Sequence, residues 1–159
     1  MKVRDLMTRQ TVSCNPDMNV AQAVELMWKG ACGFLPVVGE GGNVIGVITD
    51  RDIAIALGTR EQRASEIHVS DVMSQKLFTC TPDDDIHTAL KTLRSEGIRR
   101  LPVIDPEGAL VGVLSIDEVV VTARVEAHRS DISYEDVENT YKAILFHSSL
   151  RKNRERQAA

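Results

Sequence analysis

Two stretches decide the fold of this chain: Gly46-Val47-Ile48-Thr49-Asp50-Arg51-Asp52 and Gly112-Val113-Leu114-Ser115-Ile116-Asp117-Glu118. Each is a short apolar run that ends in a hydroxyl residue, and an acid follows three residues later. This pattern predicts a buried strand that turns directly into a helix, with Thr49 or Ser115 at the turn. Because the first helical turn exposes unpaired N–H groups, each junction can hold an anion or can simply cap its helix.

The two stretches belong to a repeat with a constant offset, since Met7 matches Met73 and 73 − 7 = 66. The offset also carries Cys14 to Cys80, Pro16-Asp17 to Pro82-Asp83 and Leu35-Pro36-Val37 to Leu101-Pro102-Val103. The copies, roughly residues 3–54 and 69–120, align without a gap. Such self-similarity indicates two copies of one supersecondary unit that cannot bury its apolar face alone. We therefore expect the halves to pack on each other about a pseudo-two-fold axis.

The first copy predicts the order β-α-β-β-α after a short helical turn at residues 3–7. Asn19 with Gln22 forms a capping-box pattern at the start of a helix, which Gly30 or Gly33 ends. The buried stripe of this helix is predicted to be Val20, Ala23, Val24 and Met27. The predicted strands are residues 11–14, 34–38 and 44–49, with a turn at Asn15-Pro16-Asp17, and the exit helix is 52–57, ended by Gly58.

The second copy follows the same plan, with strands at residues 77–80, 101–104 and 110–114. Asp85 is predicted to cap its helix, Gly97 to end it, and Ser115 to open the exit helix. The buried stripe is predicted to be Ile86, Ala89, Leu90 and Leu93. The fold class is therefore α/β of the α+β kind, with two helices on one face of each small sheet. The expected domains are residues 1–58 and 69–123, with a connector at 59–68 and a helical extension at 124–159.

The extension lies outside the repeat. Ser133 and Asp136 have capping-box spacing, and they predict an amphipathic helix of about four turns with a frayed tail. Its apolar stripe is predicted to be Val137, Tyr141, Ile144 and Leu145, and its tail carries Arg151, Lys152, Arg154 and Arg156. The stripe must cover either its own domain or a second subunit.

Composition excludes several classes of protein. A net charge of −4 over 159 residues argues against a general nucleic-acid binder, and no apolar run approaches the roughly 20 residues of a membrane span. No apolar leader follows Met1, and three cysteines without Cys-x-x-Cys spacing favour a reducing compartment, so we expect a cytoplasmic protein. The four histidines lack metal-ligand spacing, and no P-loop, Gly-x-Ser-x-Gly or His-Glu-x-x-His motif indicates an enzyme.

One family combines these motifs. The order Val-x-Asp-h-Met, Pro-Asp, a helix, h-Pro-Val and Gly-h-h-Thr/Ser-x-x-acid, where h is apolar, resembles the cystathionine-β-synthase (CBS) domain. Two in tandem resemble a Bateman module, and the resemblance covers roughly residues 1–123. It implies two β-α-β-β-α units packed sheet to sheet, with two clefts that bind AMP, ADP, ATP or S-adenosylmethionine. It also implies a homodimer.

The resemblance implies roles for particular residues. Thr49 and Asp52 match the ribose motif, although Thr-x-x-Asp and Ser-x-x-Glu also read as capping boxes. Glu118 departs from the family's Asp, which puts ribose binding beside Ser115 in doubt. The remaining implied contacts are Arg51, Arg99 and Arg100 to phosphate, with Arg100 favoured over Arg99, and Cys14, Asn15, Cys80, Thr81 and Pro102 around adenine. For both thiols, simple burial in a strand is the preferred interpretation.

The leading hypothesis is therefore a non-catalytic adenine-nucleotide sensor that needs no cofactor and is read by an unidentified enzyme or transporter. The junctions are predicted to be unequal: the first keeps the ribose motif, the second has the arginines, and the second is narrowly preferred for a phosphorylated ligand. The alternative is a ligand-free module for protein–protein interaction or oligomerisation through the C-terminal helix. Nucleic-acid binding by residues 151–156 is a weaker idea, because that run is short, lacks aromatics and contains Glu155.

Overall fold

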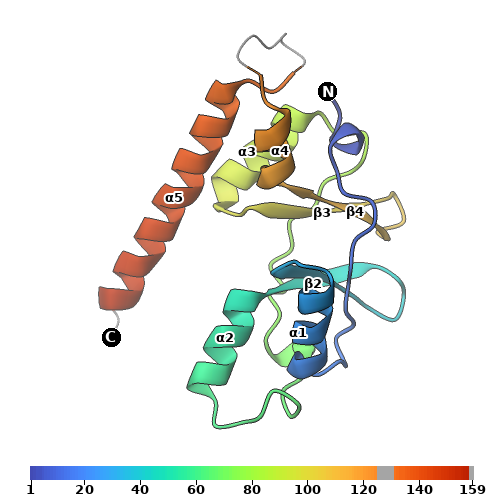
Figure 1. Ribbon diagram of the computed structural model, residues 1–159, viewed down its shortest axis with the longest axis vertical. Helices are drawn as coiled ribbons and strands as arrows, with labels where there is room; N and C mark the ends of the chain where they lie inside the picture. The colour runs from blue at the N-terminus through green and yellow to red at the C-terminus, as the bar shows by residue number, and fades with distance from the viewer. Residues whose placement is uncertain (125–130, 158–159) are drawn as a thin grey trace. The chain divides into compact units, whose positions relative to one another are not determined.

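The chain has a mixed α+β fold, as the sequence predicts (Figure 1). The computed structural model describes residues 1–124 and 131–157, with side chains described as far as His147. The elements are η1 (Val3–Asp5), α1 (Val20–Lys29), β1 (Phe34–Val38), β2 (Val44–Thr49), α2 (Asp50–Thr59), η2 (Val69–Asp71), α3 (Ile86–Glu96), β3 (Arg100–Ile104), β4 (Leu110–Ser115), α4 (Ile116–Thr122) and α5 (Tyr134–Gln157). The strands form two sheets, β1-β2 and β3-β4.

Two compact units divide these elements differently from the sequence repeat. The N-terminal unit contains Arg9–Leu77 and Ile104–Val111. The C-terminal unit contains Met1–Thr8, Phe78–Val103 and Gly112–Ala159. The first residues of each sequence copy therefore belong to the unit built on the other copy. The domain boundaries expected from the sequence stay a prediction.

We call residues 1–8 and 69–77 the exchanged segments, and backbone hydrogen bonds hold each of them in its unit. In the C-terminal unit, the Thr8 N–H donates to the Val113 carbonyl at 2.9 Å, and the Thr8 carbonyl accepts from the Val113 N–H at 3.0 Å. In the N-terminal unit, the Ser74 and Val47 backbones pair in the same way, at 2.8 and 3.1 Å. Thr8 and Ser74 are 66 residues apart, as are Val47 and Val113, so the same interaction occurs once in each unit. Each exchanged segment adds a short antiparallel contact to the last strand of its unit.

Glycine makes this contact possible. A Cβ atom added to Gly46 would lie 2.8 Å from the Ser74 carbonyl oxygen, and one added to Gly112 would lie 2.8 Å from that of Thr8. Both glycines are buried. The Gly-h-h-Thr/Ser motif therefore begins with glycine because another segment of backbone lies directly against it.

The helix caps form largely as predicted. Asn19 and Gln22 make a capping box with N–O distances of 3.0 and 2.9 Å, and Gly30 ends α1. Asp85 caps α3 through the His87 N–H at 2.9 Å. Gly97 ends α3 at φ 65°, a left-handed conformation that favours glycine.

The buried stripes match the prediction except at one position. All four predicted residues of α3 are buried, whereas Val24 of α1 is 43% exposed. The exit helix α2 also runs further than predicted, because Gly58 stays within the helix. The Arg60 N–H donates to the Ala56 carbonyl at 3.0 Å, so the helix ends at Thr59.

The first predicted strand of each copy is wrong, because it is reduced to a single bridge. Cys14 pairs with Val37 and Cys80 pairs with Val103, both in parallel. The Cys14 N–H donates to the Pro36 carbonyl at 3.1 Å, and Cys80 does the same to Pro102 at 3.1 Å. Since proline has no N–H to extend this ladder, its carbonyl supports one bridge at this edge rather than a full strand.

The C-terminal helix α5 is longer than the predicted four turns, since its 24 residues continue through the basic tail. Ser133 and Asp136 form the predicted capping box, with both N–O distances at 3.1 Å. Leu145 is 55% exposed, so the prediction that it belongs to the buried stripe is wrong. Thr140, which the apolar pattern missed, is fully buried. The side chains of the basic tail lie outside the described residues.

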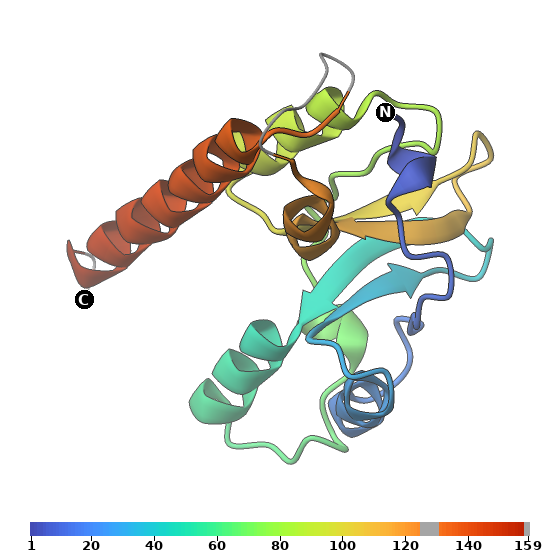
Figure 2. The same ribbon diagram turned by 45° about the horizontal axis from the view of Figure 1, so that its top comes forward.

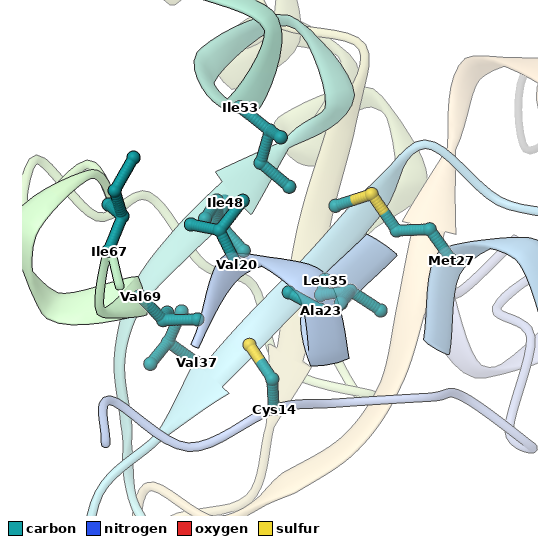
Figure 3. Close-up of a cluster of buried hydrophobic side chains, with 10 residues drawn as sticks. All are labelled: Cys14, Val20, Ala23, Met27, Leu35, Val37, Ile48, Ile53, Ile67 and Val69. Carbon is teal, nitrogen blue, oxygen red and sulfur yellow. The ribbon is translucent and has the colours of Figure 1, made fainter. Parts of the chain in front are cut away.

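The core of the N-terminal unit is drawn in Figure 3. It gathers side chains from α1, both strands and α2, and it includes Ile67 and Val69 from the segment after α2. Cys14 lies in this core, and burial raises the pKa of its thiol to about 11. Burial and the nearby Asp84 carboxylate raise the pKa of Cys80 to about 12. These two thiols are core groups with little thiolate at neutral pH.

We expect Gly46→Ala and Gly112→Ala each to lower the free energy of unfolding by about 1–3 kcal/mol, because the new methyl group overlaps a carbonyl oxygen. Urea denaturation would measure the loss. Gly41→Ala is the matched control, since nothing lies within 4 Å of the added Cβ atom. Equal stability of all three variants would contradict the close approach of the exchanged segments.

We expect one thiol to react quickly with a disulfide reagent in the native protein at pH 8, and three after unfolding. Cys32 is half-buried, whereas Cys14 and Cys80 are buried and would remain protonated at that pH. Time-resolved thiol titration would show the two phases, and Cys32→Ser should remove the fast one. Three equally fast thiols would show that Cys14 and Cys80 are not core residues.

Candidate functional site

The N-terminal unit brings together the two residues of the predicted ribose motif at the start of α2. The Thr49 hydroxyl donates to Asp52 Oδ2 at 2.6 Å, and the Thr49 N–H donates to the same oxygen at 2.9 Å. The Asp52 N–H donates in return to Thr49 Oγ1 at 3.2 Å. The capping box is therefore confirmed, and both residues are half-buried. The carboxylate stands at the edge of the core with its position fixed by the helix it caps.

The first junction is bordered by Gly33, which has no side chain, and by the acidic residue Asp50. The Asp50 N–H donates to the Gly33 carbonyl at 3.2 Å, and a Cβ atom at Gly33 would overlap the Asp50 carboxylate. Asp50 also accepts from the Arg51 N–H at 2.7 Å, as suits an anion at a helix N-terminus. Arg51 is exposed, so its guanidinium can reach a ligand in solvent without first leaving a buried position.

The C-terminal unit builds the equivalent junction with different partners. Ser115 is buried and caps α4 through Asp117, with the hydroxyl donating to Asp117 Oδ2 at 3.0 Å and accepting from the Asp117 N–H at 3.0 Å. The capping box predicted from Ser115 and Glu118 is therefore wrong. Glu118 Oε1 instead accepts from the Thr8 hydroxyl at 3.1 Å. The longer Glu side chain reaches the exchanged segment, while the shorter Asp117 takes the cap.

Of the two predicted arginines in this unit, Arg100 lies at the junction. Its Nη2 is 3.3 Å from Asp117 Oδ2. Arg99 contributes its carbonyl, which accepts from the Ile116 N–H at 2.9 Å, while its side chain is exposed. β3 begins at Arg100, and the preference for Arg100 as a phosphate contact stays a prediction. The second junction therefore holds one guanidinium beside two carboxylates.

The residues that the family resemblance places around adenine lie beside the first strand of each hairpin. Cys80 and Pro102 are both buried, and the Cys80 N–H donates to the Pro102 carbonyl. The Asn15 side chain accepts from the N–H groups of Asp17 and Met18 at 3.1 and 2.9 Å, which confirms the predicted turn. The Thr81 N–H donates to Asp84 Oδ2 at 2.8 Å, so Thr81 also begins a turn.

A surface cavity of about 330 Å³ opens beside the second junction, entirely within the C-terminal unit. Its lining residues are Asp5, Leu6, Asp117, Glu118, Val121 and Thr122. Sequence reasoning missed Asp5 and Thr8 here, because nothing local shows that residues 1–8 join the second copy. Asp117 was visible in the repeat alignment, where it replaces Arg51.

The described residues offer neither a metal site nor a membrane span. No group of three or more His, Cys, Asp or Glu side chains in that part of the chain is arranged to hold a metal ion. No described helix is long and apolar enough to cross a membrane.

Three solved structures resemble the fold. The CBS domain protein TA0289 of Thermoplasma acidophilum, of unknown function, has a TM-score of 0.75 at 21% identity, covering 90% of this chain and 75% of that one. The CBS domain pair of MJ0100, solved with 5′-methylthioadenosine and S-adenosyl-L-methionine, has a TM-score of 0.67 at 22% identity, covering 76% and 94%. CBSX2, solved with AMP, has a TM-score of 0.64 at 26% identity, covering 76% and 93%.

Other proteins are similar to this chain in sequence. The CBS domain-containing protein YhcV of Bacillus subtilis is 35% identical over 119 residues, which are 75% of this chain and 83% of YhcV. The uncharacterised protein MK0525 of Methanopyrus kandleri is 28% identical over 120 residues, which are 76% of this chain but 61% of MK0525. The match spans less than a quarter of several longer relatives that are enzymes.

A family model matches both copies of the repeat. The model for the CBS domain matches this chain twice, at residues 3–59 and 69–123, and these ranges contain the two copies of the repeat. The chain therefore belongs to the CBS domain family and carries a tandem pair of its domains.

Proposed function

We propose that this CBS pair is a non-catalytic regulatory protein that binds an adenosine-containing ligand, with the ribose held by Thr49 and Asp52. The observation that carries the proposal is the 2.6 Å hydrogen bond between the Thr49 hydroxyl and Asp52 Oδ2. A carboxylate has about four lone-pair positions. The cap uses two of them, both on Oδ2, so Asp52 can still accept from the 2′ and 3′ hydroxyls of a ribose.

The second junction is less suited to ribose. Glu118 Oε1 accepts from Thr8, and Glu118 Oε2 has no hydrogen-bond partner but is buried, so a ribose hydroxyl could reach it only after the side chain moved. Asp117 beside it is bonded to both Ser115 and Arg100. A phosphate at Arg100 would also meet the charge of Asp117 at close range. On this geometry we favour the first junction for ribose, which reverses the narrow preference drawn from sequence. Arg100 remains a proposed anion contact at a second, non-equivalent site.

Similarity supports the ligand class. CBSX2 was solved with AMP and has a comparable fold at 26% identity. AMP is therefore the first ligand to test, followed by ADP, ATP and S-adenosylmethionine. A ligand regulates only if it binds two states of the protein with different affinities. We propose that an enzyme or transporter reads the change, and that the working form is a homodimer.

One observation favours the alternative function, an association module that acts through α5. Leu145 and Phe146 are 55% and 64% exposed on this helix. Exposed apolar side chains of this size are a feature of interaction surfaces when they cluster. A module of this kind would show no thermal response to nucleotides.

We expect AMP at 100 times its dissociation constant to raise the melting temperature by about 5–10 °C, because ligand binding then adds about 2.7 kcal/mol to stability. Thr49→Ala should remove this response and also cost about 1 kcal/mol through loss of the cap. Asn19→Ala is the matched control, since it breaks the capping box of α1 but should leave the AMP response intact. Thermal melts and calorimetric titration would measure both quantities.

Two results would contradict the proposal. One is the absence of any thermal shift with millimolar AMP, ADP, ATP or S-adenosylmethionine. The other is an AMP affinity that Asn19→Ala and Thr49→Ala lower equally, which would reduce Thr49 to a helix cap.

At the second, non-equivalent site, we expect Arg100→Ala to weaken AMP binding about tenfold while leaving adenosine binding nearly unchanged, because a guanidinium acts on the phosphate alone. Arg99→Ala is the control, since that neighbouring side chain is exposed and has the same charge. Paired titrations with AMP and adenosine would separate the two effects. Equal losses for the two ligands would mean that Arg100 supports the fold rather than the phosphate.

A further inference from the structure

One face of α3 is covered by α5, and Figures 1 and 2 show the two helices running side by side. Arg94 Nε donates to the buried Thr140 hydroxyl at 2.8 Å, and that hydroxyl donates to the Asp136 carbonyl at 2.6 Å. Leu90 lies on the same face between His87 and Arg94, three and four residues away, and it is fully buried. This face of α3 is therefore closed by a helix of the same unit.

His87 lies where α3 meets the first turn of α5, between two carboxylates. Its Nδ1 is 3.1 Å from Asp85 Oδ1, and its Nε2 is 3.7 Å from Asp136 Oδ2. A neutral imidazole has one N–H, so it can donate to one of these carboxylates and turns a lone pair toward the other. The imidazolium has an N–H on each nitrogen and can donate to both. The geometry therefore fits the protonated ring better than the neutral ring.

Both carboxylates stay ionised in the pH range where an imidazole titrates. The His87 N–H donates to Asp85 and lowers the pKa of that carboxyl. Burial would raise the pKa of Asp136, but the hydrogen bonds from Ser133 and the charges of His87 and Arg94 outweigh burial and lower this pKa. The negative charges on either side of the ring are therefore constant between about pH 5 and 8.

Two further charged groups act on this cluster in the described part of the chain. Arg94 Nη2 on α3 is 3.5 Å from Asp136 Oδ1, and a guanidinium keeps its proton throughout this pH range. The Met1 amino group acts on Asp85, which precedes α3. An amino terminus and an imidazole both titrate between about pH 5 and 8. Of these two groups, His87 is the one that lies against α5.

The cluster accompanies α5 and is not a feature of the repeat. The repeat offset pairs this face of α3 with uncharged residues of α1: His87 with Ala21, Leu90 with Val24 and Arg94 with Trp28. All three α1 residues are exposed, and the described part of the N-terminal unit has no helix equivalent to α5. The histidine and the arginine therefore occur in the copy that α5 covers, as expected of groups that hold α5 rather than the fold common to both copies.

We propose that α5 is a pH-dependent latch, held more firmly on α3 when His87 is protonated and links Asp85 to Asp136. Raising the pH removes the proton, and one ring nitrogen then turns a lone pair toward a carboxylate. Because docked α5 offers His87 a carboxylate that undocked α5 does not, protonation and docking favour each other. Loosening α5 would uncover Leu90 and Ile144, so the exposed apolar surface of the C-terminal unit would increase as the pH rises. The proposal does not depend on nucleotide binding.

Hydrogen exchange of residues 134–147, measured by mass spectrometry on the nucleotide-free full chain at pH 6 and pH 8, would test the latch. Protection is taken relative to the intrinsic exchange rate at each pH. We expect the native chain to be about two- to fivefold more protected at pH 6, which is the range of a partly exposed ion pair. His87→Gln should show the weaker protection at both pH values. His87→Arg should show the stronger protection at both, because arginine keeps its charge.

His68→Gln is the matched control, since His68 is exposed and belongs to the N-terminal unit. This variant should keep the pH dependence of the native chain. Far-UV circular dichroism would show that each variant folds.

Three results would overturn the proposal. The first is a native chain in which residues 134–147 are equally protected at pH 6 and pH 8. The second is a His87→Gln variant that keeps the full pH dependence, since another group, such as the Met1 amino group, would then control α5. The third is a His87→Arg variant that is as weakly protected as His87→Gln, which would show that charge at this position does not hold the helix. Because no nucleotide is present, none of these results bears on the proposed ligand site.

Discussion

The fold depends on one backbone contact that is made twice. Thr8 pairs with Val113 in the C-terminal unit, and Ser74 pairs with Val47 in the N-terminal unit, each beside a glycine with no side chain to obstruct it. The two contacts place the first residues of each copy in the unit built on the other copy. Neither copy is therefore a complete unit in sequence order. This explains why a gapless repeat of about 50 residues does not build two independent domains, and why the motif that opens each junction must start with glycine.

The two junctions share this scaffold and have diverged in charge. The first has Gly33, Arg51 and Asp52 at the positions where the second has Arg99, Asp117 and Glu118. One added methylene takes the Glu118 carboxylate away from the cap and onto Thr8, and Asp117 replaces it. One copy thus keeps an acid held by its own helix, while the other ties its acid to the exchanged segment. Equivalent positions of the repeat consequently present different side-chain chemistry at the two junctions.

The sequence predicted the features whose interacting residues lie within one helical turn of each other. The capping boxes of Asn19 and Thr49 form because both partners are three residues apart. The partner of Glu118 is Thr8, which is 110 residues away, and no local pattern reveals it. Val24 and Leu90 show the same limit, because both have the spacing of a buried stripe but only Leu90 lies under a covering helix. The prediction of strands at Cys14 and Cys80 is wrong for another reason. A proline in the neighbouring strand limits the hydrogen-bonded ladder to one bridge.

The C-terminal helix breaks the symmetry that the repeat would otherwise impose. Without α5, the equivalent faces of α1 and α3 would both be open. Because α5 closes the α3 face with Thr140 and Asp136, the α1 face with Trp28 remains as the distinct surface. That surface belongs to the same unit as Thr49 and Asp52, and α1 contacts α2 in this unit. A ribose held at the start of α2, as proposed above, would therefore act on a helix that packs against α1. Coupling between two sites requires a physical element that both can bias, and the α1–α2 contact would be that element for the proposed ribose site.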